Sequence, residues 1–166
     1  MLRKILLVLG IAFIAIQFFP VEKNDSNDQT YAMSTMYQLD DNIKQMLVVA
    51  CNDCHSNTTN YPWYGNVQPV AWWLADHIDH GKRDLNFSEF TNLPLAIQYH
   101  KFEEIVEKVE KKEMPLESYT KFGLHADANL SDEQRGQLIN WAKAQMSHMK
   151  ATYPADSLVR KRRPRS

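Results

Sequence analysis

The apolar residues of this chain follow two different patterns. Near the N-terminus they form one continuous stretch, residues 5–19, which is interrupted only by Gly10 and Gln17 and is closed by Pro20. Further along, apolar residues return at intervals, with polar residues between them. A continuous stretch is typical of a membrane-directed segment, whereas spaced apolar residues are typical of amphipathic helices that bury one face.

The flanks of the continuous stretch indicate export. Arg3 and Lys4 precede it, and a polar run from Glu22 to Asp28 follows. A positive start, an apolar middle and a polar exit characterise a secretory signal or an N-terminal anchor. No small-residue cleavage site follows directly, so we expect an uncleaved anchor, with a cleaved signal and a buried core helix as the alternatives. Either export interpretation places the rest of the chain outside the cytoplasmic membrane.

The spaced apolar residues of the body predict four helices, over residues 39–54, 70–80, 96–112 and 131–149. In the first of these, Ile43, Met46, Leu47 and Ala50 recur at helical spacing. No strand pattern and no internal repeat stand out. We therefore predict an all-α fold, a small domain of about four helices preceded by an N-terminal hydrophobic helix.

Local signals set the expected helix ends. Asp40 or Asp41 can cap the first helix, and Pro69 can open the second, which we expect to stop near Gly81. The run Ser131–Gln134 reads as a capping box that opens the last helix.

These elements divide the chain into four parts. We expect a membrane anchor or signal segment over residues 1–20, a linker over 21–36, a helical domain over 37–150 and a basic tail over 151–166. The linker is expected to be flexible because it is polar.

Charge is unevenly placed along the chain. Residues 1–20 and 160–166 hold seven of the nineteen basic residues and no acid, which leaves twelve basic residues against twenty acidic ones between Val21 and Val159. An acidic body argues against nucleic-acid binding. The basic tail is expected to be solvated, although it can also touch anionic lipid or a partner.

Both cysteines fall in the single motif Cys51-Asn52-Asp53-Cys54-His55. C-x-x-C-H is the attachment signature of c-type haem: two thiols can each form a thioether with one vinyl group, and the adjacent imidazole then lies at the iron. A redox disulfide and half of a zinc site are the alternatives, but no second cysteine pair completes a zinc site. We expect covalent haem c, with His55 as an iron ligand.

With His55 as one iron ligand, the sixth coordination position of the iron calls for another residue. Met114 follows a predicted helix and precedes Pro115, which fits a stiff loop across a haem face. We expect Met114 to ligate the iron, although core packing is the ordinary role of methionine. The rival ligands are four histidines, namely His77, His80, His100 and His125.

Aromatic residues gather after the motif. We expect Tyr61, Trp63, Tyr64 and Trp72 to contribute to the haem pocket, where their polar tips can bond a propionate. Ordinary core packing is the alternative for each of them.

These motifs together resemble the haem-binding-domain family of exported, often membrane-anchored bacterial proteins, which is common in Bacteroidota. The resemblance implies a cytochrome-c-like helical fold and carries haem attachment onto Cys51, Cys54 and His55, but it implies no reaction. The matching segments, which cover nearly the whole chain except the basic tail, are 51–57, 61–64, 67–74, 77–82, 85–90, 114–119 and 130–141.

Three functions fit a single haem outside the membrane. We expect an electron carrier rather than an enzyme, because a haem with His and Met ligands has no open coordination position. A relay or assembly subunit of a membrane redox complex is the second hypothesis, and a haem enzyme or gas sensor with an open sixth position is the third. The expected partners are redox proteins of the membrane or periplasm, together with the membrane itself. The protein is expected to be anchored in the inner membrane with its haem domain in the periplasm, or soluble there after signal cleavage.

Overall fold

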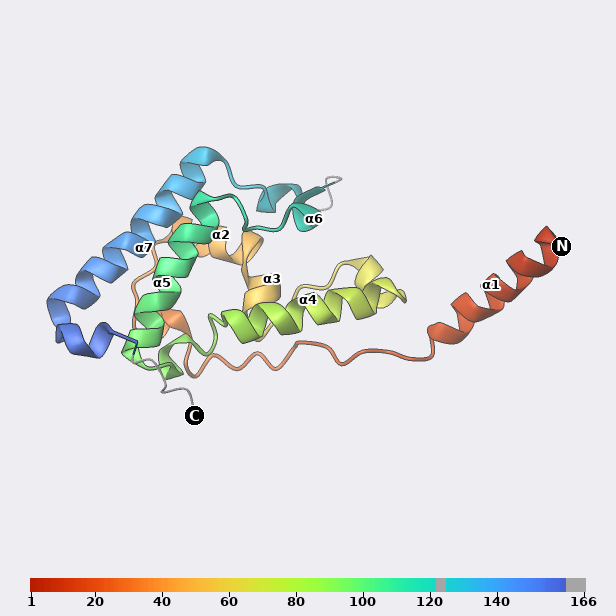
Figure 1. Cartoon of the computed structure of the whole chain (residues 1–166), viewed down its shortest axis with the longest axis horizontal. Helices are drawn as coiled ribbons and strands as arrows, with labels where there is room; N and C mark the ends of the chain where they lie inside the picture. The colour runs from red at the N-terminus through yellow and green to blue at the C-terminus, as the bar shows by residue number, and fades with distance from the viewer. Residues whose placement is uncertain (122–124, 161–166) are drawn as a thin grey trace.

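A computed structural model describes residues 1–121 and 125–160 of the chain (Figure 1). These residues contain α-helices, short 3₁₀ turns and no strand, which confirms the predicted all-α fold. Residues 161–166 of the predicted basic tail lie outside the described residues. The helices are α1 Leu2–Ile16, α2 Asp41–Ala50, α3 Asn52–His55, α4 Val70–Asp84, α5 Leu95–Glu110, α6 Glu117–Thr120 and α7 Asp132–Thr152.

Helix α1 lies apart from the rest of the molecule (Figure 1). It contains 15 residues, none of which is buried, so its apolar side chains find no partner within the chain. Within residues 1–121 and 125–160, the helices are all too short or too polar to cross a bilayer.

The core of the body lies where α5 and α7 run side by side and α2 packs against them (Figure 1). Phe102 on α5 is fully buried. Its ring makes edge-on contacts with three other aromatic rings, with ring centroids 4.9 Å apart for Tyr37, 5.1 Å for Phe90 and 5.7 Å for Trp141. Such contacts are favourable for aromatic rings. The side chains predicted to share one face of the first helix, Ile43, Met46, Leu47 and Ala50, are all buried in this core.

Two predicted helix starts are confirmed. Asp40 accepts a hydrogen bond from the Ile43 amide at 2.8 Å and so caps α2. Ser131 and Gln134 form the reciprocal bonds of a capping box at the start of α7.

The predicted stop of the second helix near Gly81 is wrong. Helix α4 continues through Gly81 to Asp84. Glycine is present there because α4 passes very close to α3, and a Cβ at Gly81 would lie 2.6 Å from the Cys54 carbonyl oxygen.

The polar segment after α1 lies against the body instead of standing free of it. The Asn24 side chain donates to the Ser56 carbonyl and to Thr59 Oγ1, both at 2.9 Å, and accepts from Lys82 Nζ at 2.6 Å. The Asn27 amide donates to the Asn57 carbonyl at 3.3 Å. Figure 1 shows this segment running alongside α4. Polarity alone predicted a flexible linker, but its polar groups bond to the loop that follows the cysteine motif.

Candidate functional site

The cysteine motif consists of Cys51, at the junction of α2 and α3, and of the short helix α3 itself. Cys51 ends α2 with a φ of −131°, and its amide still donates to the Leu47 carbonyl. The Cys51 carbonyl then accepts from the amides of Cys54, at 3.2 Å, and His55, at 3.0 Å. The turn brings both thiols and the imidazole to one corner of the body, which is the arrangement that the spacing of the motif predicts.

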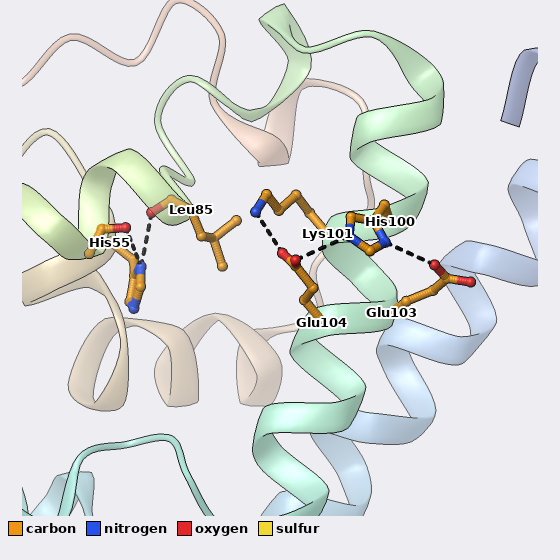
Figure 2. A network of polar contacts seen from close by, with 7 residues as sticks. His55, Leu85, His100, Lys101, Glu103 and Glu104 are labelled. Atoms are coloured by element: carbon orange, nitrogen blue, oxygen red, sulfur yellow. Dashed lines mark hydrogen bonds and ion pairs between the residues drawn. The ribbon is translucent and has the colours of Figure 1, made fainter. Parts of the chain in front are cut away.

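The imidazole of His55 is oriented by α4 and the residue after it. Its Nδ1 lies 2.9 Å from the carbonyl oxygens of Gly81 and Leu85 (Figure 2). A carbonyl only accepts, so Nδ1 must carry a proton, and in the neutral ring Nε2 then holds the lone pair. A backbone carbonyl on the other ring nitrogen is the usual support of a metal-binding histidine. The ring is thus held in the tautomer that can ligate iron through Nε2.

Both thiols are free. Burial raises the pKa of Cys51 to about 12, and nearby Cys54 adds to that rise; burial also raises the pKa of Cys54 to about 11. At neutral pH both are therefore protonated. Disulfide exchange needs the thiolate, so this environment does not favour a redox disulfide. In the described parts of the chain, no group of three or more His, Cys, Asp or Glu side chains could hold a metal ion, so no further ligands of these types complete a zinc site.

Two cavities, of about 270 and 240 Å³, open beside the motif, and Cys51, His55, Asp84 and Met114 line both of them. Each is slightly smaller than the ~300–1,000 Å³ of typical ligand sites, and the two share four lining residues. The first is also lined by Cys54, His77, His80, Gly81, Pro115, Leu116 and Tyr119. The second is also lined by Leu47, Leu85, Phe87, Lys101, Ile105, Val109 and Leu138. Thiols, a preset imidazole and a largely apolar space fit the predicted haem.

Met114 shares both cavities with His55 although 58 positions separate them in sequence. Its loop is held by its main chain: the amide donates to the Lys108 carbonyl at 3.2 Å, and the carbonyl accepts from Arg135 of α7 at 2.6 Å. Pro115 is buried beside it. The structure therefore brings the two predicted ligands to one site, and ligation by Met114 stays a prediction.

The rival histidines divide into two pairs. His77 and His80 line the first cavity, and each bonds through Nδ1 to a carbonyl of its own helix, at 2.9 and 2.7 Å. His100 lies on α5 between Glu103 and Glu104, and His125 bonds to Tyr64, so neither lines these cavities. Among histidines, only the first pair remains close enough to compete with Met114.

The four predicted aromatic residues lie elsewhere. Tyr61, Trp63, Tyr64 and Trp72 are absent from the lining of both cavities. Tyr61 stacks under Lys23, Tyr64 bonds to His125 at 2.7 Å, and the two tryptophans are exposed. Their proximity in sequence suggested a pocket wall. Trp63 and Trp72 lie at the start of α4, whereas Tyr64 reaches the neighbourhood of the first cavity through His125, whose ring stacks on Tyr119 of the lining. Contact of these four with haem stays a prediction that the cavity geometry does not support.

Other residues, which the sequence did not single out, line the site instead. Tyr119 donates to Asp53 at 2.7 Å, so the loop after Met114 is tied to a middle residue of the cysteine motif. From α5, Lys101 points toward Leu85 and pairs with Glu104 at 2.6 Å (Figure 2). Only the nearness of Tyr119 to Met114 in sequence could have indicated that Tyr119 contacts the motif at Asp53. No local sequence signal indicated that Lys101 lies at the site.

Comparison with known protein families also indicates haem binding. The family model described as the haem-binding domain matches residues 11–144, which is most of the chain. The chain belongs to the haem-binding-domain family, and it is a haem-binding protein with an all-α body. No curated protein and no solved structure matched it.

The contact at Gly81 yields a test of the site. In Gly81→Ala the new methyl would overlap the Cys54 carbonyl, so α3 and α4 must separate and the His55–Gly81 bond must weaken. We expect a loss of about 1–3 kcal/mol in the free energy of unfolding, measured by urea denaturation, and a shifted haem absorption band. Gly136→Ala is the matched control. That glycine lies within α7 with nothing near its Cβ position, so the change should raise stability by ~0.4–1 kcal/mol. Equal effects of the two substitutions would contradict the role given to Gly81.

Proposed function

We propose that this protein holds one haem through thioethers to Cys51 and Cys54, with His55 and Met114 as axial ligands, and that it transfers single electrons outside the cytoplasmic membrane. The observation that carries the proposal is the His55 imidazole, fixed through Nδ1 by two carbonyls beside the two thiols. Met114 lines the same two cavities as His55, which supports its assignment as the second iron ligand.

When bound, haem supplies a site that accepts and releases one electron. The residues of this chain set how readily it does so. Thioether sulfur is a soft donor that prefers ferrous iron, so Met114 would stabilise the reduced state. Leu47, Ile105 and Leu138 give part of the lining an apolar surface that would pack against a bound porphyrin, while Asp84, Lys101, Glu104 and Lys108 line the same cavity and would set the charge around it. Haem held by both His55 and Met114 would have no open coordination position, which suits electron transfer better than bond chemistry.

The proposed location depends on the N-terminal segment. Arg3 and Lys4 lie in the first turn of α1, ahead of its apolar residues, and this charge bias favours a cytoplasmic N-terminus with the body on the outer side. Attachment of c-type haem normally takes place on that side. Redox proteins of the membrane or periplasm are the proposed partners.

Covalent attachment is tested by removing both thiols. A Cys51→Ser, Cys54→Ser double variant cannot form thioethers, so haem should be lost from the polypeptide under denaturing conditions. The measurement is haem staining after denaturing electrophoresis of protein made with a haem-maturation system. Each single variant keeps one thiol and should retain weaker staining, which controls for folding. Undiminished staining of the double variant would refute covalent attachment.

The sixth ligand is tested by Met114→Ala. Haem should stay attached while the variant binds carbon monoxide readily and shows a lower reduction potential, measured by absorption spectroscopy in a redox titration. Met146→Ala is the matched control: this half-buried methionine packs on the core from α7. It should cost about 2–5 kcal/mol of stability and leave the haem spectrum unchanged.

Two results would overturn ligation by Met114. One is a Met114→Ala spectrum identical to that of the wild type. The other is a bis-histidine spectrum of the wild type, which would transfer the role to His77 or His80. Rapid carbon monoxide binding by the wild type would instead support the enzyme or gas-sensor hypothesis.

Topology is tested with reporters fused after Ser166. A reporter that is active only in the periplasm should be active there, and a reporter that requires the cytoplasm should be silent at the same site. The reverse pattern would exclude export and the proposed haem attachment with it.

A further inference from the structure

Three exposed tryptophan residues lie together at the start of α4. Trp63 belongs to the 3₁₀ turn Trp63–Asn66, and Trp72 and Trp73 belong to the first turn of α4, which packs on it. Their side chains are 77 %, 39 % and 48 % exposed. We call these three residues the tryptophan cap. Exposed aromatic clusters of this kind mark surfaces that contact another body.

The tryptophan cap is bonded to the base of α1. Trp72 Nε1 and Gln68 Nε2 each donate to the Phe19 carbonyl at 3.0 Å. The Gln68 amide donates to Gln17 Oε1 at 2.9 Å, and Gln17 Nε2 donates to the Gln68 carbonyl at 3.2 Å. Phe18 and Phe19 are themselves exposed. Hydrogen bonds of Gln17, Gln68 and Trp72 therefore hold the exposed Phe18 and Phe19 at the base of α1 beside the tryptophan cap.

The composition of this region suits a lipid surface. Residues 61–75 contain no charged side chain, although the body around them is acidic. Tryptophan combines an apolar ring with a polar N–H, and it is enriched at the boundary between lipid headgroups and hydrocarbon. A charged or purely aliphatic surface would lack this preference.

The length of α1 brings the body close to the bilayer. Its 15 residues, at ~1.5 Å each, make a rod about 22 Å long, shorter than a hydrocarbon core of ~30 Å. An anchor of this length draws the segment at its base, and the body bonded to it, toward the headgroup layer. The tryptophan cap is the part of the body that lies there.

We propose that the tryptophan cap inserts into the interfacial layer of the bilayer that holds α1 and so fixes the orientation of the haem-binding body on the membrane. This inference rests on the proposed membrane location. It assigns a lipid surface, rather than a haem pocket, to Trp63 and Trp72.

The test measures depth with a fluorescent label on the haem-loaded full chain in nanodiscs of phosphatidylcholine and phosphatidylglycerol. In the proposed holoprotein both native thiols are in thioethers, so an introduced cysteine is the only reactive one, and labelling of the unmodified chain controls for this. The variants are Leu9→Cys within α1, Trp63→Cys and Trp73→Cys in the tryptophan cap, and Glu133→Cys on the exposed start of α7. Each sample is compared with and without lipids that carry a nitroxide quencher, so any constant quenching by haem cancels.

We expect headgroup nitroxides to reduce the emission of the labels at positions 63 and 73, and mid-chain nitroxides to reduce that at position 9. The label at 133 should be affected by neither. A quenched label at 9 with unquenched labels at 63 and 73 would overturn the inference while leaving the membrane location intact. An unquenched label at 9 would refute the membrane location, and the inference with it.

Discussion

The contact between α3 and the C-terminal turn of α4 organises the site. One imidazole nitrogen meets two carbonyl oxygens, from Gly81 and Leu85, and the missing Cβ of Gly81 allows the two backbones to approach. The same approach positions Cys54 and presents Nε2 of His55. Two residues after Leu85, the Phe87 amide donates to the His55 carbonyl at 2.7 Å. His55 is therefore held through both its side chain and its main chain.

Hydrophobic periodicity predicted most of the fold because it reflects which face each helix buries. It located α2, α5 and α7, and cap chemistry located the starts of α2 and α7. The helix end predicted near Gly81 was wrong, because a glycine that ends a helix and a glycine at a close contact between two helices look identical in sequence. Only the tertiary packing distinguishes the two.

The candidate site was predicted in part for a similar reason. The residues that carry local chemical signals, Cys51, Cys54, His55 and Met114, all line the first cavity, and all of them except Cys54 also line the second. The wall could not be predicted, because its members Lys101, Ile105 and Leu138 come from distant helices with no local signature. The aromatic residues that follow the motif in sequence, Tyr61, Trp63, Tyr64 and Trp72, do not line these two cavities, so closeness in sequence alone does not place a side chain in their wall.

The loop of Met114 is fixed by main-chain atoms. Arg135 reaches from α7 to the carbonyl of Met114, and the Lys108 carbonyl accepts the Met114 amide, so neither bond depends on the methionine side chain. Substitution at position 114 can therefore change the side chain that lines the two cavities without changing the path of the backbone. In evolutionary terms, the identity of this side chain is separated from folding: if the proposed function holds, a single codon change would give the same scaffold a different iron ligand and with it a different reduction potential.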